Sequence, residues 1–398
     1  IRDSGKVTFM NGSIVGVAEG TKPAEDTPNW HGAPAMMIQN YCDLTLQSMT
    51  ISGGDETVYT MSNNHGNVVI KDTTINAGKA KGSSYRPYAF DVCGYGSYTG
   101  VSVSVENSTI NGNIELSKSK GNTYDATLTL GSGTTVNGSI SVGDNGDKVA
   151  VTKDNSVDVT APDGYKWVDG ETGQTLAKIV MVAEVNGKQY ETLQAAIDAA
   201  IRNQTVKLIA DTTENVTMET PYLTLDLNGH TLNGGQVKGK PALTVTARVT
   251  VKDTSAEQTG TIMREDTADN SGVSSHYVID IQGNGWLTFE SGNVTNNSGV
   301  VGVKGASLVR VGDDSVAKYP GLNIKGGSFR QDNFIAIKVD RGDLFLNGGT
   351  ITSANSYAIE NWHRATIKGG TVKGSVASWT YSGGSNSTTT IIGGTING

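Results

Sequence analysis

The chain has 398 residues with 51 glycines and only 8 prolines, and its formal net charge is −8. An acidic chain of this kind offers no basic surface for a phosphate backbone, so nucleic acid is not expected as a partner. The longest apolar stretch, 179–185, is far shorter than the ~20 residues that a membrane-spanning helix needs, so membrane insertion is not expected either.

A short phrase recurs along most of the chain. It has the form apolar-Thr-apolar-x-Gly-Gly-Thr-apolar, and in its four clearest copies the first glycine recurs at steps of 22, 21 and 24 residues, from Gly326 to Gly393. About a dozen copies are present when looser matches are included. In chain order they begin at Val7, Leu44, Val68, Val103, Leu128, Leu223, Val249, Leu287, Leu322, Leu344, Ala365 and Thr389.

Each copy alternates apolar and polar residues with period two, which is typical of a strand with one buried face. A second strand of the type small-apolar-x-apolar precedes most copies, as at 89–92 and 336–339. A unit of ~22 residues is too short for a strand-helix-strand crossover of ~30, so successive copies can pair in parallel only by coiling around an axis. The sequence therefore predicts an all-β solenoid, a parallel β-helix with Gly-Gly and Asn-Gly at its corners.

Two long segments in the first half carry aromatic side chains. Residues 21–34 include Trp30 and His31, and residues 78–98 include four tyrosines with an arginine between them. Tyr, Trp and Arg dominate interface hot spots, and aromatic rings also stack on sugars. We therefore predict a binding site on these loops, with the alternative that the rings only cover the edge of the core. The predicted binding residues are Trp30, His31, Tyr85, Arg86, Tyr88, Tyr95 and Tyr98.

The two cysteines, Cys42 and Cys93, are predicted to be free thiols. They should lie two coils apart, about 10 Å at ~4.8 Å per coil, whereas a disulfide requires Cα atoms within ~7 Å. Two cysteines also cannot form a thiolate zinc site, and the histidines are isolated singles without metal-ligand spacing. We therefore expect neither a metal nor a cofactor.

The repeat is interrupted near the middle of the chain. Residues 160–183 are polar and rich in turn residues, and we expect them to close a first module. An amphipathic helix is predicted next, at about 192–202 with Thr192 as its N-cap, and it should cover the open strand edge of a second module. Two modules are therefore expected, 1–183 and 184–398. The apolar positions of the helix are Leu193, Ala196, Ile197, Ala200 and Ile201.

The outward position after each core triplet carries charges of alternating sign. Enzymes that cleave acidic polysaccharides need two or three carboxylates close together, which this pattern does not provide. It favours a solvated ladder of ion pairs between stacked strands, and the sequence predicts no catalytic residue. The position reads Asp226, Lys252, Glu290, Lys325, Asn347 and Lys368 in the second half, and includes Gln47, Lys71 and Glu106 in the first.

The tripeptide Arg341-Gly342-Asp343 matches one that some cell-adhesion ligands present to integrins. It falls between two predicted strands, which places it on an exposed corner. Because Gly342 also suits an ordinary turn, an adhesion tripeptide and a plain turn both stay open. A second, weaker aromatic patch is present at 362–364.

Three segments resemble the tandem β-helix modules of large surface proteins of Gram-positive gut bacteria. They are TAPDGYKWVDG at 160–170, VNGKQYETLQAAID at 185–198 and TLDLNGHTLNGG at 224–235. The resemblance implies right-handed parallel β-helices, often described as pectin-lyase-like, in an extracellular protein that is cell-wall attached or secreted. The first module lacks an entry helix and the second lacks a closing Gly-Tyr-Lys-Trp segment, so we expect both to be part of a longer chain.

Together these features suggest a non-catalytic adhesin or binding segment. Its rigid coils would hold loops toward a host glycoprotein, a mucin glycan or an immunoglobulin, with little loss of ordering entropy on contact. A polysaccharide lyase or glycoside hydrolase with the same fold is one alternative, and a passive structural spacer is another. Three carboxylates that meet on one wall would favour the enzyme, whereas aromatic loops packed inward would favour the spacer.

Overall fold

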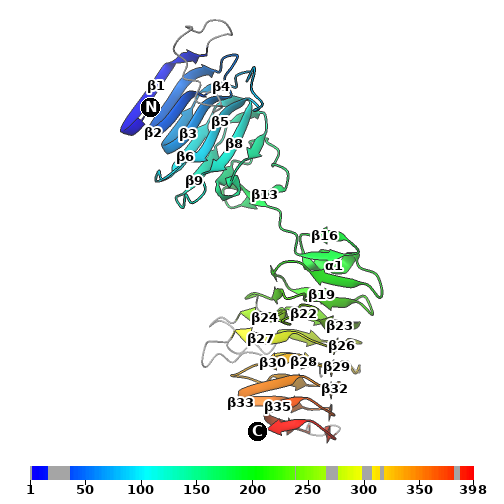
Figure 1. Ribbon diagram of the computed structural model, residues 1–398. Helices are drawn as coiled ribbons and strands as arrows, with labels where there is room; N and C mark the ends of the chain where they lie inside the picture. Colours follow the sequence, from blue (N-terminus) through cyan, green and yellow to red (C-terminus); the bar gives the residue numbers. More distant parts are fainter. Residues whose placement is uncertain are drawn as a thin grey trace. The chain divides into compact units, whose positions relative to one another are not determined.

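The computed structural model describes residues 2–16, 36–237, 239–265, 277–297, 307–313, 318–380 and 386–398. The chain divides into two compact units, Ile1–Ile179 (unit 1) and Val180–Gly398 (unit 2). Strands dominate both units, and most of them pair in parallel (Figure 1). The predicted all-β, parallel architecture with a short α-helix is therefore confirmed for the described residues.

Unit 1 is a single sheet that curls around its own core. The long strands β2 and β3 each contribute to more than one side of the curl. The early part of β2 pairs with β3 while its last residues pair with β4. Likewise, the early part of β3 pairs with β5 and its later part with β6. The described strands are β1 Arg2–Val15, β2 Met36–Ser52, β3 Tyr59–Lys71, β4 Thr74–Asn76, β5 Tyr88–Gly94, β6 Val101–Glu106, β7 Thr109–Asn111, β8 Asn113–Lys118, β9 Ala126–Leu130, β10 Thr135–Asn137, β11 Ile140–Val142, β12 Ala150–Lys153, β13 Tyr165–Gly170 and β14 Gly173–Lys178.

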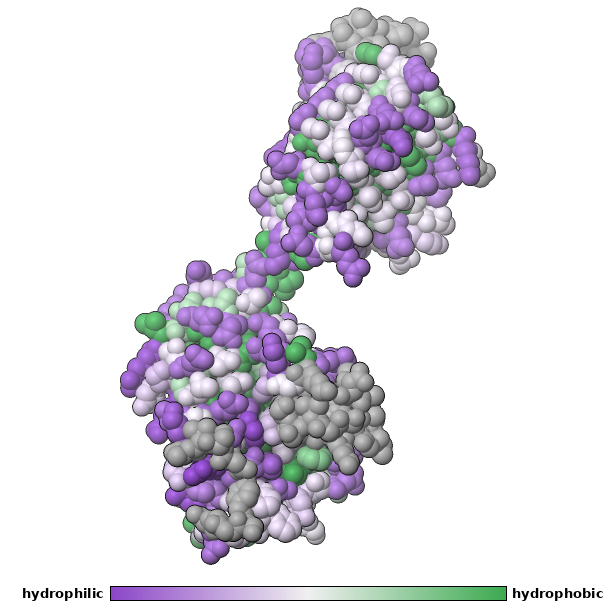
Figure 2. Space-filling view, turned by 180° about the vertical axis from the view of Figure 1, so that it is seen from behind, coloured by the Kyte–Doolittle hydropathy of each residue, from purple (hydrophilic) through white to green (hydrophobic). Residues whose placement is uncertain are grey.

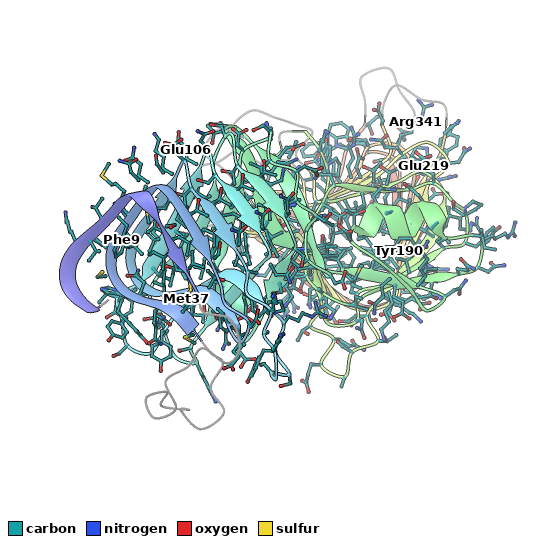
Figure 3. All side chains as sticks on the ribbon, turned by 90° about the horizontal axis from the view of Figure 1, so that it is seen from above. Phe9, Met37, Glu106, Tyr190, Glu219 and Arg341 are labelled. Atoms are coloured by element: carbon teal, nitrogen blue, oxygen red, sulfur yellow. The ribbon has the colours of Figure 1, made fainter. Side chains whose placement is uncertain are left out.

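The core of unit 1 is built from apolar side chains stacked between successive coils. Val103 of β6 is paired with Val68 of β3 on one side and with Leu128 of β9 on the other, and all three side chains are buried. Seen from above in Figure 3, Phe9 lies on the inner side of the curl, where it packs against this core, and Glu106 lies outside. The period-two alternation of the sequence thus decides which side chains enter the core.

The segment predicted to close the first module forms an antiparallel hairpin, β13 with β14. Strand β14 also pairs antiparallel with β12, so the hairpin covers the edge strand of the parallel sheet. Trp167 packs against the core, and its Nε1 donates a hydrogen bond to the Val159 carbonyl oxygen at 2.8 Å. This closure explains why the repeat stops in this region.

Unit 2 is built from two sheets whose strands are mostly parallel. The first sheet contains β15 Ala183–Val185, β16 Lys188–Tyr190, β17 Thr205–Leu208, β20 Thr224–Asp226, β23 Arg248–Lys252, β26 Trp286–Phe289, β29 Gly321–Ile324, β32 Asp343–Leu346, β34 Arg364–Ile367 and β36 Thr388–Ile391. The second contains β18 Thr212–Thr213, β19 Val216–Met218, β21 Thr231–Asn233, β22 Leu243–Val245, β24 Thr261–Glu265, β25 Ile279–Ile281, β27 Asn293–Asn297, β28 Val309–Val311, β30 Ser328–Arg330, β31 Ile337–Val339, β33 Thr350–Asn361, β35 Thr371–Ser378 and β37 Thr395–Asn397.

The coils of unit 2 repeat in register. One coil contributes β29 to the first sheet and then β30 and β31 to the second, and the next coil stacks on it through β32. The corner glycines are required by this stacking. Gly349 has φ of 78°, and a Cβ added there would lie 2.7 Å from the carbonyl oxygen of Gly327 in the preceding coil. Only glycine satisfies both the backbone angle and the close approach, which accounts for the Gly-Gly pairs.

The predicted capping helix is confirmed as α1, Leu193–Ala199, with Thr192 as its N-cap. The Thr192 hydroxyl accepts a hydrogen bond from the Ala195 amide at 3.2 Å. The carboxylate of Glu214 accepts from the backbone amides of Leu193 at 2.7 Å and of Gln194 at 3.1 Å, so it satisfies two amides that have no partner within the helix. Figure 3 shows α1 lying across the coils of unit 2, with Tyr190 beside it.

The helix is shorter than the predicted range of 192–202. It ends at Ala199, and Ala200 is already extended, with φ of −79° and ψ of 138°. As a result Ile201, which we expected on the apolar face, is exposed. The hydrophobic periodicity was correct only as far as Ala200, which is buried although it lies beyond the last helical turn.

The predicted ladder of opposite charges is confirmed at two places. Lys71 lies 3.5 Å from Glu106 in unit 1, and Lys325 lies 3.1 Å from Glu290 in unit 2. Asp226 departs from the pattern, because it is buried and accepts hydrogen bonds from the backbone amide and the hydroxyl of Thr254.

Most of the surface visible in Figure 2 is hydrophilic or intermediate in hydropathy. In the described ranges, no helix has the length and apolarity that a bilayer crossing demands.

Candidate binding site

The predicted binding residues are distributed over several places. Trp30 and His31 lie outside the described residues. Tyr85 and Arg86 are exposed on the loop between β4 and β5. Tyr88 begins strand β5 and is buried, whereas Tyr95 and Tyr98 follow the same strand in the next loop. Segment 78–98 is therefore two loops separated by a strand, and it places its tyrosines in two different clusters.

Tyr95 and Tyr98 form an aromatic cluster with Tyr41 and His65, which we call the Tyr41 cluster. The ring of Tyr41 lies 6.0 Å from that of Tyr95 and 5.0 Å from that of Tyr98, measured between centroids. His65 lies 5.2 Å from Tyr98. Register pairing of β2 with β3 places Tyr41 directly against His65, so two neighbouring coils support the cluster.

The Tyr41 cluster is anchored at its base and open at its top. Tyr41 is buried, and the Nδ1 atom of His65 donates to the Gly100 carbonyl oxygen at 2.9 Å, which fixes the imidazole ring. Tyr95 is 47 % exposed. The cluster therefore presents an aromatic surface whose lower rings are held in place before any ligand arrives.

A second pair of tyrosines stacks farther along the same strands. Tyr59 of β3 and Tyr88 of β5 are register partners, and their rings lie 4.9 Å apart at an interplanar angle of 10°. The Tyr59 hydroxyl donates to Oε2 of Glu115 at 2.7 Å. With Val58 and Ala80 these rings form a small apolar group separate from the main core, so they lie on the outer side of the sheet.

Between the two aromatic groups lie two carboxylates on adjacent coils. Asp91 of β5 is the register partner of Glu115 on β8 and of Ser62 on β3. Asp91 is only 4 % exposed, and its oxygens accept hydrogen bonds from the Ser62 hydroxyl at 2.9 Å and from the Asn63 amide at 2.7 Å. Like charges on paired strand positions repel each other, so this arrangement differs from the ion-pair ladder found elsewhere.

Burial raises the pKa of Asp91 to about 7, against the opposing effect of its hydrogen bonds from Asn63 and Ser62, and the charge of Glu115 raises it further. Burial also raises the pKa of Tyr59, and its hydrogen bond to Glu115 adds to the effect. The Tyr59 phenol therefore stays protonated as a donor, while Asp91 exchanges its proton near neutral pH.

Along β3 the chain thus carries Tyr59, Ser62 and His65, with carboxylates of the neighbouring coils beside them. Aromatic rings offer stacking faces for sugar rings, and carboxylate and hydroxyl oxygens accept or donate hydrogen bonds to sugar hydroxyls. The same chemistry would also serve an aromatic protein epitope.

Tyr41, Tyr59, His65, Asp91 and Glu115 were not identified from the sequence. The predicted charge ladder occupies the outward position after each core triplet, whereas Asp91 and Glu115 occupy the outward position of the preceding strand. The signal was present, since Asp91 follows Ala89 and Phe90, and Glu115 follows Ile114 in the next coil. Aligning those strands by their apolar residues would have placed the two acids in one column.

The tripeptide Arg341-Gly342-Asp343 lies at a corner, as expected, but the corner is not the exposed one that was predicted, because Gly342 is buried and the aspartate is engaged within the fold. The Asp343 side chain is 15 % exposed, and both its oxygens accept hydrogen bonds from the guanidinium of Arg364. The Gly342 carbonyl oxygen accepts from Nδ1 of His363 at 2.7 Å, and Gly342 has φ of 152°. Arg341 lies at the outer rim of the coils (Figure 3), where its guanidinium is 5.6 Å from the Tyr319 ring centroid.

Both cysteines are free thiols, as predicted. In the described part of the chain, no group of three or more His, Cys, Asp or Glu side chains is arranged to hold a metal ion. Among the described residues of unit 1, two carboxylates, rather than three, meet on the outer side of the sheet.

Comparisons with known proteins identify no relative of this chain. No family model matches the chain, and neither the curated proteins nor the solved structures contain a match.

Proposed function

We propose that the chain is a non-catalytic binding segment of a bacterial cell-surface adhesin, built from two right-handed parallel β-helix modules. In this proposal it is extracellular, either cell-wall attached or secreted, and recognises a host glycoprotein, a mucin glycan or an immunoglobulin. The observation that carries the proposal is the Tyr41 cluster, in which the exposed ring of Tyr95 lies against the buried ring of Tyr41. The half-buried rings of Tyr98 and His65 pack beside them.

This cluster supports binding because its geometry is fixed in advance. A ring that is already packed on one side loses little rotational freedom when a ligand covers its other side. Among the three ligand classes the glycan is favoured, since the sheet that carries the aromatic surface also presents the partly exposed carboxylate of Glu115. Stacking on the rings would supply affinity, and the polar groups would select the sugar.

The proposal is tested with an array that carries mucin glycans, host glycoproteins and immunoglobulins. We expect the unmodified chain to bind a subset of glycan-bearing spots and the double variant Tyr95→Ala, Tyr98→Ala to lose at least tenfold in affinity, which corresponds to ~1.4 kcal/mol. Tyr124→Ala is the matched control, because this tyrosine is also 47 % exposed and makes no ring contact among the described residues. Equal binding by the double variant and the unmodified chain would refute the site.

The carboxylate pair supports a second candidate function, a polysaccharide lyase or glycoside hydrolase. Register partners on adjacent parallel strands lie ~4.8 Å apart, close to the ~5 Å separation of the two carboxyl groups in retaining glycosidases. An acid that exchanges its proton near neutral pH beside a second carboxylate is also the arrangement such chemistry uses. Against it, Asp91 is buried and already holds two donors, so substrate could reach only Glu115.

The two functions are separated by assaying acidic and neutral polysaccharides for new reducing ends and for the ultraviolet absorbance of unsaturated products. The adhesin proposal expects no turnover by the unmodified chain. Turnover that is lost in Glu115→Gln, with binding retained, would establish the enzyme instead.

A further inference from the structure

The first sheet of unit 2 carries aromatic and cationic side chains on its outer face. Strand register places Arg248 beside Trp286, and the guanidinium lies 5.4 Å from the indole centroid. The indole lies 6.0 Å from the ring of Phe345, and the Phe345 ring lies 5.9 Å from the ammonium of Lys368. Three side chains from three strands, with Lys368 directly after a fourth strand, β34, thus form one continuous series of cation–ring and ring–ring contacts.

Gly321 makes the contact between Trp286 and Phe345 possible. It is the register partner of Trp286 on the intervening strand β29, and a Cβ added there would lie 2.5 Å from the indole ring. The indole therefore lies across the position that a side chain would occupy, and it reaches Phe345 on the strand beyond. The backbone angle of Gly321 does not require glycine, because its φ is not positive. Glycine is required at this position because the indole ring leaves no room for a Cβ atom.

A second group of rings and cations adjoins this series at the corner before the sheet. Tyr319 is 52 % exposed, and its ring stacks on His363 with centroids 5.0 Å apart. The guanidinium groups of Arg341 and Arg364 lie 5.6 Å and 5.7 Å from the same ring. We use the name Trp286 wall for the whole surface, which consists of Arg248, Trp286, Tyr319, Arg341, Phe345 and Lys368.

The charge of the wall is opposite to that of the chain. The whole chain has a formal net charge of −8, yet the acids on this face are already engaged: Asp343 with Arg364 and Glu290 with Lys325. Among the described residues, Arg248 and Lys368 form no ion pair, and each contacts a ring. Cations without an acid partner, held beside aromatic faces, attract an anionic ligand that also has a face to stack.

We propose that the Trp286 wall binds an extended acidic polysaccharide, one whose sugar rings carry carboxylate or sulfate groups. The sugar faces stack on Trp286, Phe345 and Tyr319, and the anionic groups pair with Arg248 and Lys368. The coils rise ~4.8 Å each, so a chain lying along the stack meets a cation or a ring on each of several strands. An acidic peptide has the charge but presents no series of flat ring faces, so the alternation of rings and cations favours the polysaccharide.

This site lies in unit 2 and goes beyond the function proposed above, which rests on the Tyr41 cluster of unit 1. The experiment measures binding of the full chain to dextran sulfate, with unsulfated dextran as the matched neutral polymer, and to polygalacturonate, with its methyl ester as the matched control. Poly-glutamate serves as the acidic peptide. We expect binding to one or both anionic polymers, weakening as salt rises, and none to dextran or to the ester.

Three variants localise the binding. Trp286→Ala should weaken binding about tenfold, the scale of a lost ring contact, and Lys368→Gln should weaken it severalfold. Lys373→Gln is the control, since Lys373 is exposed on strand β35 of the other sheet. Gly321→Ala forces the indole away from Phe345 without changing charge, and we expect it to reduce affinity and to alter tryptophan fluorescence.

Dextran bound as tightly as dextran sulfate would overturn the proposal. It would also be overturned if Lys373→Gln weakened binding as much as Lys368→Gln, or if poly-glutamate bound as tightly as the anionic polysaccharides. The variant Tyr95→Ala, Tyr98→Ala should leave binding to the anionic polymers unchanged, so failure of one site is distinguishable from failure of the other.

Discussion

Asp91 on β5 and Glu115 on β8 are register partners, so two carboxylates lie side by side on the outer side of unit 1. The Tyr59 hydroxyl donates to Glu115, and the Ser62 hydroxyl and the Asn63 amide donate to Asp91. The equivalent strand pair in unit 2, β25 with β28, joins Asp280 to Arg310 in a two-pronged ion pair. The two units therefore share a pairing geometry, but it brings two acids together in unit 1 and an acid and a base together in unit 2.

This difference predicts how the stability of unit 1 depends on pH. The pKa of Asp91 is raised from an ordinary 3.8 to about 7, so the folded state binds more protons than the unfolded state between these values. The stabilisation is fully present below pH ~4 and is lost as the pH rises through about 7. We expect unit 1 to become less stable by a few kcal/mol at most on this account, measured by urea unfolding between pH 5 and pH 8.

Asp91→Asn is the matched variant for this measurement. The amide resembles the protonated acid, and the Ser62 hydroxyl can turn to accept from it, so the variant should fold and show a flatter dependence on pH. An equal dependence on pH in Asp91→Asn and in the unmodified chain would show that Asp91 is already charged in the folded state throughout this range.

A second prediction concerns the N-terminus of α1. Glu214→Ala removes the acceptor of two backbone amides, which for a helix cap costs about 1–2 kcal/mol. Amide hydrogen exchange within 193–199 should therefore become about 5 to 30 times faster, the factor that this free energy corresponds to. Glu219→Ala is the control, because Glu219 is exposed and accepts no helix amide. Equal exchange in the two variants would mean that Glu214 does not hold the helix.

The strands were predictable because their signal is local. The alternation within 322–329 or 344–351 identifies a strand from eight residues, and the repeat of such segments indicates coils that stack. The contents of the sites were not predictable in the same way. Tyr41 meets His65 only through a register between coils 24 residues apart, and that register shifts by one residue just before the pair. A single residue of shift reverses which side chains face outward, and no sequence pattern reports it.

The adhesion tripeptide illustrates the same limit. Its position at a corner was correctly expected, but the contact of Asp343 with Arg364 depends on stacking with the next coil. Because the Asp343 carboxylate is already paired with Arg364, we predict that the immobilised protein does not support integrin-dependent cell attachment. A soluble Arg-Gly-Asp peptide should leave the number of attached cells unchanged. Attachment that the peptide blocks, and that Asp343→Glu abolishes, would contradict this prediction.

The last prediction concerns the two thiols. Burial raises the pKa of Cys93 to about 11, and burial is also the main reason for the raised pKa of Cys42. At pH 8 only about one Cys93 side chain in a thousand is then a thiolate, and the thiolate is the reactive form. We expect iodoacetamide to modify neither cysteine of the folded chain during an exposure that fully modifies both in urea, as read by mass spectrometry of the intact protein. Rapid labelling of the folded chain would contradict this prediction, because it would mean that a thiol is far more exposed, or lies in a more electropositive setting, than the fold provides. An intact mass two hydrogens below that of the dithiol before labelling would reveal a disulfide, which the separation of the coils forbids.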